Sequence, residues 1–148
     1  AYGGWVVDDH HSAGFFHQGS FGLHEDDRAH AYQGVPFSIP FRSLYSRNVA
    51  NLLMAGRNIS ASQLAMADTR VMLTCAVMGQ AAGTGAALCV KHATTPRGVY
   101  ERHLDELQQQ LLKDGAYLIG LSNHDCRDLA RAARVTASSE GTYQGQPM

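Results

Sequence analysis

The chain has 148 residues, of which 45% are hydrophobic, so it is long enough to bury a core of its own. Its formal net charge of −1 gives no electrostatic basis for binding nucleic acid or an anionic membrane surface. The odd number of cysteines (Cys75, Cys89 and Cys126) and the lack of C-x-x-C spacing argue against a complete disulfide framework. The chain begins at Ala1 without Met or a visible signal peptide, and we expect a fragment or a processed piece of a longer protein.

Residues 1–34 show no sustained helical or strand period, so we expect loops and short edge strands there. Many of the residues in this segment are His, Asp or Glu, the types that bind metals or transfer protons in other proteins. These side chains are Asp8, Asp9, His10, His11, His17, His24, Glu25, Asp26, Asp27 and His30. Their spacing fits no established ligand motif, so for the part from His17 to His30 a solvated loop and a chemical site both stay open.

The next segment, residues 35–50, has two prolines with apolar residues alternating between them. This pattern predicts an extended edge segment. Four apolar residues, 52–55, then end at Gly56 and predict a buried parallel strand, although a helical turn has the same pattern. A polar loop is expected over residues 57–62.

A long helix is predicted from about Arg70 to Val90, with Asp68 or Thr69 as its N-cap. A strand, a glycine turn and a helix N-terminus together form a cradle for an anion or a cofactor, because free backbone N–H groups point into the crevice beyond the strand. We therefore expect a binding site near Gly56.

The predicted helix carries no charge between Arg70 and Lys91, which is about the length needed to cross a bilayer. Polar residues interrupt it, and its many Gly and Ala residues supply little transfer energy. We therefore favour a helix buried on most sides of an α/β protein over a membrane span. Each interior glycine costs about 1 kcal/mol of helix propensity relative to alanine, and close approach of a neighbouring segment or cofactor would explain Gly79, Gly83 and Gly85.

A second helix is expected to start at Thr95 as N-cap with Pro96 in its first turn, and to end before Gly115. Its apolar stripe consists of Leu104, Leu107 and Leu111. Glu101, Asp105, Glu106 and Lys113 are expected to face water. We assign this helix a packing role only.

The run IPFRSLYSRNVANLLMAGRNISASQLAMADTRVMLTCAVMGQAAGTGAAL, with GGWVVDDH upstream, resembles the C-terminal part of the FAD-dependent oxidoreductase family over about residues 3–120. The resemblance implies an α/β fold containing the end of a Rossmann-like FAD-binding domain. It also implies an enzyme that transfers hydride between an organic or carbohydrate substrate and FAD. The expected division is a substrate-side segment of loops and edge strands (1–45), the C-terminal part of the FAD-binding domain (46–122), and a linker with the start of a carbohydrate-binding domain (123–148).

The resemblance assigns cofactor contacts to the loop after the predicted strand and to the start of the long helix. These residues are Gly56, Arg57, Asn58, Ile59, Ser60, Arg70, Val71, Met72, Leu73 and Thr74. At the helix start, backbone N–H groups would face the pyrimidine end of the flavin ring, where a positive helix end stabilises charge on reduced flavin. Leu73 replaces the family's usual Pro, which costs some preorganisation but no donor.

On the substrate side, His10 would take a substrate proton while Asp8 orients its imidazole. Arg42 is placed to orient a substrate carboxylate or a flavin oxygen, and a purely structural role fits it equally well. Gln63 is assigned with Arg42 to substrate binding. It stands where many members of the family have His, so a proton-transfer role at that position is not carried over.

The sequence contains no G-x-G-x-x-G fingerprint for a dinucleotide pyrophosphate. We therefore expect this chain to supply the isoalloxazine side of the site, with the rest of the parent FAD domain as its partner. Residues 133–140 are similar to the opening strand of discoidin-like (F5/8 type C) sugar-binding domains. Such a tail would imply a secreted or periplasmic enzyme, and without it we expect a cytoplasmic one.

Two other classes of function stay open. The histidine- and aspartate-rich segment would suit a metal-dependent hydrolase or lyase, and the C-terminal segment would suit a non-catalytic sugar-binding or interaction piece.

Overall fold

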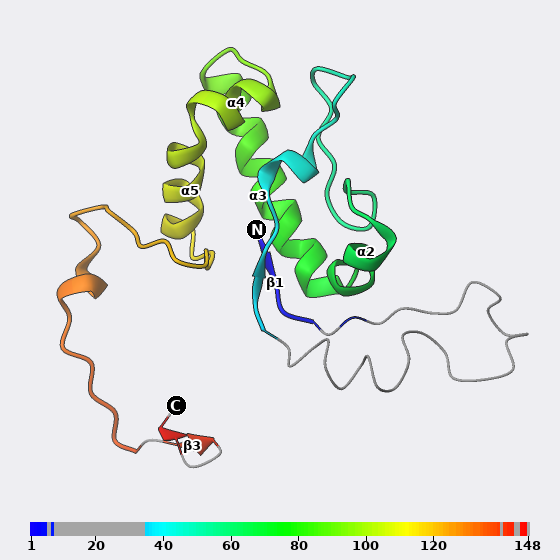
Figure 1. The fold of residues 1–148 in the computed structure, drawn as a ribbon. Helices are drawn as coiled ribbons and strands as arrows, with labels where there is room; N and C mark the ends of the chain where they lie inside the picture. The colour runs from blue at the N-terminus through cyan, green and yellow to red at the C-terminus, as the bar shows by residue number, and fades with distance from the viewer. Residues whose placement is uncertain (6, 8–34, 140, 144–145, 148) are drawn as a thin grey trace, which may run out of the picture.

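A computed structural model describes residues 1–5, 7, 35–139, 141–143 and 146–147 (Figure 1). Asp8 and His10 lie outside the described residues. In chain order the elements are β1 (Tyr2–Gly3), β2 (Phe37–Ser38), the 3-10 helix η2 (Phe41–Leu44), α2 (Gln63–Thr69), α3 (Met72–Lys91), α4 (Pro96–Arg102), α5 (Leu104–Lys113), the 3-10 helix η3 (Leu129–Ala132), β3 (Thr142–Tyr143) and β4 (Gln146–Pro147).

The fold is rich in helix, and its strands are short. β1 and β2 pair antiparallel, with Tyr2 opposite Ser38, and β3 pairs antiparallel with β4. The fold therefore contains both helices and strands, as the α/β prediction requires at the coarsest level. The described residues contain no parallel sheet, so the Rossmann-like part of the expectation is not confirmed.

The prediction of a strand over residues 52–55 is wrong for the described chain. Leu53 forms only an isolated antiparallel bridge with Tyr45, and the Met54 N–H donates to the Leu44 carbonyl at 2.8 Å. The physical reason is that no neighbouring described strand offers a row of partners, so this apolar segment pairs once with the chain leaving η2. Gly56 then turns the chain with a φ of +88°.

Both predicted N-caps of the long helix are also wrong, because Asp68 and Thr69 lie inside α2. We did not predict α2 from the sequence. Its start is marked by Ser62, whose hydroxyl accepts from the Ala65 N–H at 3.3 Å. The following α3 begins at Met72, with Val71 as an N-cap that makes no side-chain hydrogen bond.

The core lies along one side of α3, which contacts β1, η2, α4 and α5 (Figure 1). Its fully buried side chains are Leu44, Met78, Val99 and Leu107. Phe41 from η2 lies so close to Gly85 that a Cβ atom built there would be 2.6 Å from the ring. Close approach therefore explains Gly85, whereas a Cβ at Gly79 or Gly83 meets no described atom within 4 Å.

The opposite side of α3 is uncovered by the described residues. The exposed positions include Leu73, Ala76, Gly83, Ala87 and Val90. Among the described residues, the expectation of a helix buried on most sides is therefore not met. By length and composition alone α3 is also able to cross a membrane, with a mean hydropathy of 1.4 and 33% of the segment buried.

The second predicted helix is divided into two at His103, which is the C-cap of α4 and the N-cap of α5. Thr95 caps α4 as predicted, because its hydroxyl accepts from the Gly98 N–H at 3.2 Å. The helical run ends before Gly115, whose φ of +84° favours glycine. Residues 133–139 form no strand, so the similarity to a discoidin-like domain stays a prediction.

Candidate functional site

A groove of about 650 Å³ lies where β1 meets the start of α3. One wall comes from the N-terminal segment and the other from the start of α3, although these segments are far apart in the sequence. The lining residues are Tyr2, Gly3, Gly4, Trp5, Arg70, Val71, Met72, Leu73, Thr74 and Val77. The groove therefore contains five of the predicted cofactor-binding residues together with Tyr2 and the three residues of the Gly-Gly-Trp motif.

The α3 end of the groove is a set of backbone donors. The first hydrogen bond of the helix runs from the Cys75 N–H to the Val71 carbonyl at 2.9 Å. The N–H groups of Met72, Leu73 and Thr74 consequently have no carbonyl partner within the helix. The positive end of the helix dipole lies at the same place. A ligand with acceptor atoms or negative charge along one edge would be stabilised there.

The rest of the groove is apolar. Trp5 lines it, and Met72 and Leu73 leave 88% and 82% of their surface exposed. Large apolar side chains left this open are typical of a surface that another molecule covers. An apolar wall beside a row of N–H donors suits a flat ring with polar atoms on one edge.

The predicted loop, residues 56–60, lies beside this groove and does not line it. A Cβ atom at Gly56 would be 3.8 Å from the side chain of Cys75, so the turn packs against the first turn of α3. Arg57 and Asn58 are exposed and the Ser60 N–H donates to Ser43. Ile59 is 7% exposed and belongs to the core, so its side chain faces the interior.

The two predicted substrate-binding residues lie elsewhere in the described chain. Arg42 is on η2 and lines a separate pocket with Phe41 and Leu107. Gln63 is exposed at the start of α2. Asp8 and His10 follow Trp5 closely in the sequence but are outside the described residues, so their roles stay predictions.

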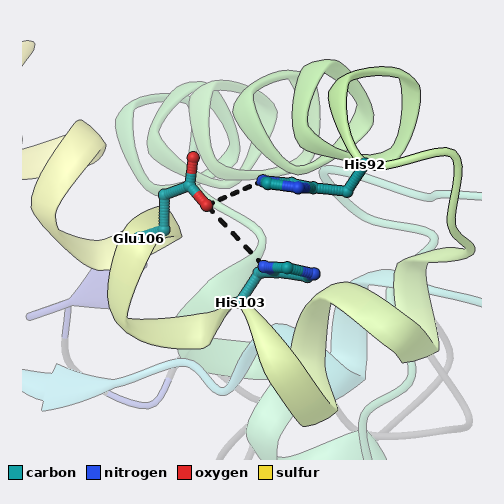
Figure 2. A group of neighbouring side chains, drawn as sticks. All are labelled: His92, His103 and Glu106. Carbon is teal, nitrogen blue, oxygen red and sulfur yellow. Dashed lines mark hydrogen bonds and ion pairs between the residues drawn. The ribbon is translucent and has the colours of Figure 1, made fainter.

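A second cluster joins the end of α3 to the start of α5 (Figure 2). The rings of His92 and His103 stack with centroids 3.9 Å apart and an angle of 11° between their planes. Glu106 lies beside both rings and faces them with its carboxylate oxygen Oε2. Its other carboxylate oxygen, Oε1, accepts from Lys91 Nζ at 2.7 Å. Hydrogen bonds from Lys91 and then His92 lower the pKa of Glu106 below its ordinary value.

Sequence reasoning missed this cluster because it placed Glu106 on a water-facing side of a packing helix. The i,i+3 spacing of His103 and Glu106 was the available local signal. Only the fold brings His92 next to them.

A family model described as FAD dependent oxidoreductase matches residues 1–111 of the 148. The chain therefore belongs to the FAD dependent oxidoreductase family, and its helix-rich fold with a small sheet is compatible with part of an FAD-binding domain. Neither the curated proteins nor the solved structures contain a match. The family membership supports a flavin-dependent oxidoreductase in general, and the whole groove lies within the matched residues.

Proposed function

We propose that this chain supplies the isoalloxazine side of the FAD site in an oxidoreductase that transfers hydride between an organic substrate and the flavin. The observation that carries the proposal is the groove at the start of α3, which combines an apolar wall with backbone donors inside the family-matched region.

The groove residues fit the ring of the cofactor that the family name implies. Trp5, Met72 and Leu73 provide apolar surface for the ring. The N–H groups in the first turn of α3, which have no carbonyl partner within the helix, suit its polar edge. When bound, FAD supplies the hydride acceptor. The chain's own contribution is the positive end of α3, which favours negative charge on a ligand at that edge.

The remaining part of the site is proposed to come from the rest of the parent FAD domain. The sequence has no G-x-G-x-x-G to hold a pyrophosphate. The uncovered side of α3, with Gly83 and Ala87 at its centre, offers a surface of small residues on which another segment can pack closely. We propose that this face is where the partner segment docks.

For the substrate side we keep His10 as the base that takes the substrate proton and Asp8 as the group that orients it. The support is the family resemblance and the position of Trp5, which lines the groove a few residues earlier. Replacing His10 with Gln should slow reduction of bound flavin by substrate by about 10²–10⁴-fold without releasing the flavin.

The test is a visible absorption spectrum, taken with an intact mass, of the protein as isolated and again after adding FAD. Gly56→Asp is the variant and Gly115→Asp its matched control. Both glycines have φ near +85°, at +88° and +84°, so both changes strain the backbone similarly. Only Gly56 packs against the first turn of α3.

We expect a flavin band in wild-type protein and in Gly115→Asp, and its loss in Gly56→Asp. If the isolated protein holds the flavin tightly, we expect its intact mass to exceed that of this chain. A wild-type protein that shows no flavin band even with added FAD contradicts the proposal.

A further inference from the structure

The cluster of His92, His103 and Glu106 has the composition of a metal site. It draws on three places in the fold: the C-cap of α3, the residue shared by α4 and α5, and the first turn of α5 (Figure 2). One ligand atom from each residue lies within 4.8 Å of the other two. Two imidazoles and a carboxylate are a ligand set that zinc takes in proteins.

The distances are close to those of a loaded site. Ligands about 2.0–2.2 Å from a tetrahedral ion lie about 3.3 Å from one another. Here His92 Nε2 is 2.8 Å and His103 Nδ1 is 3.7 Å from the same oxygen of Glu106. Because the two rings are nearly parallel, one of them must turn about χ2 before both nitrogens can point at one ion.

We propose that His92, His103 and Glu106 bind one Zn²⁺ ion, with water in the fourth position. Water has access because about a quarter of each histidine side chain and a third of the glutamate side chain are exposed. The ion would take the place of the hydrogen bond between His92 Nε2 and Glu106, and each histidine would present an unprotonated ring nitrogen to it. The site ties the end of α3 to α5, away from the flavin groove.

One neighbouring feature orients the carboxylate, and another favours a cation. Lys91 holds the other oxygen of Glu106 at 2.7 Å, which fixes the carboxylate so that its second oxygen faces the histidines. His92 sits at the C-terminal end of α3, where the helix dipole is negative and favours positive charge. The competing arrangement is the same three side chains as a surface hydrogen-bonded cluster that binds no metal.

The experiment titrates the full 148-residue chain with ZnCl₂ by calorimetry and with CoCl₂ by visible absorption, where a tetrahedral site gives d–d bands. The five histidines before residue 31 are replaced by Gln in all samples, which leaves His92, His103 and His124. His103→Gln is the test variant, and His124→Gln, outside the cluster, is the matched control. Circular dichroism confirms the fold of each protein, and Glu106→Gln replaces His103→Gln if that variant unfolds.

We expect one bound Zn²⁺ per chain, binding weakened at least about tenfold in His103→Gln, and unchanged binding in His124→Gln. His103→Cys, which supplies another zinc ligand, should restore binding. MgCl₂, which prefers oxygen ligands, should not compete. No saturable Zn²⁺ binding in the parent background overturns the proposal, and so does equal binding by His103→Gln.

Discussion

The ring of Phe41 lies over the backbone of Gly85, so closely that a Cβ atom at residue 85 would come within 2.6 Å of it. Glycine at this position lets η2 pack directly on α3. The contact holds the loop that leads to Gly56 next to the helix that forms the groove.

Replacing Gly85 with Ala should destabilise the chain by about 1–3 kcal/mol, because the added methyl overlaps a buried ring and outweighs the gain in helix propensity. Gly83→Ala is the matched control on the same helix, since no described atom lies within 4 Å of a Cβ there. The control should gain about 0.5–1 kcal/mol. Urea denaturation measures both, and a Gly85→Ala protein as stable as wild type would refute the packing argument.

A second prediction concerns the uncovered face of α3. Ala87→Glu places a charge on exposed helix surface, so the unfolding free energy of this chain alone should change by no more than about 0.5 kcal/mol. If the rest of an FAD domain docks on this face, as proposed, the same charge would be buried against it and flavin content should fall. Absorption spectra of wild type and variant, each purified as the protein occurs in its source, make the comparison. Unchanged flavin content in Ala87→Glu would show that this face is not covered by the FAD domain.

The lowered pKa of Glu106 makes stability depend on pH in a definite direction. The folded state favours the deprotonated carboxylate, chiefly through the hydrogen bond from Lys91. The stabilising contribution is therefore fully present above the unfolded pKa of about 4.3, and it is lost as pH falls through the lower folded value. Thermal unfolding with a chelator present should show that Glu106→Gln removes this part of the acid dependence. If the thermal stability of Glu106→Gln fell with decreasing pH as it does in wild type, the prediction would be contradicted.

The cysteines should differ in reactivity. Burial raises the pKa of the Cys89 thiol, and Cys126 is exposed. Because the thiolate is the reactive form, iodoacetamide should label Cys126 well before Cys89 near neutral pH. Peptide mass spectrometry over a time course follows both sites, and faster labelling of Cys89 would be inconsistent with its position.

The sequence allowed prediction of features that depend on local chemistry. Thr95 and Pro96 mark the start of α4 and Gly115 the end of the helical run, since caps and glycine turns are set by neighbouring residues. The prediction of a strand over residues 52–55 is wrong because a strand needs a neighbouring strand to pair with. A run of four apolar residues does not show whether such a neighbour exists.

For the candidate site, the family resemblance placed Arg70–Thr74 at the start of the long helix, and the structure adds Tyr2–Trp5 as the facing wall. That pairing joins residues far apart in the chain, so no local pattern predicts it. The roles of Asp8, His10, Arg42 and Gln63 stay predictions.

The central claim, that flavin binds at the start of α3, is tested most directly by Leu73→Asp with Leu129→Asp as its matched control. Both leucines are exposed to the same degree, at 82% and 83%, but only Leu73 lines the groove. Aspartate in the first turn of α3 suits the helix dipole, so the fold is kept. Its carboxylate competes for the N–H groups that have no carbonyl partner within the helix. The measurement is flavin bound per protein, by absorption, in the protein as it occurs in its source, with added FAD. We predict binding weakened by about tenfold or more in Leu73→Asp, a loss of at least about 1.4 kcal/mol, and no change in Leu129→Asp. Equal flavin content in both variants and wild type would contradict a flavin site in this groove.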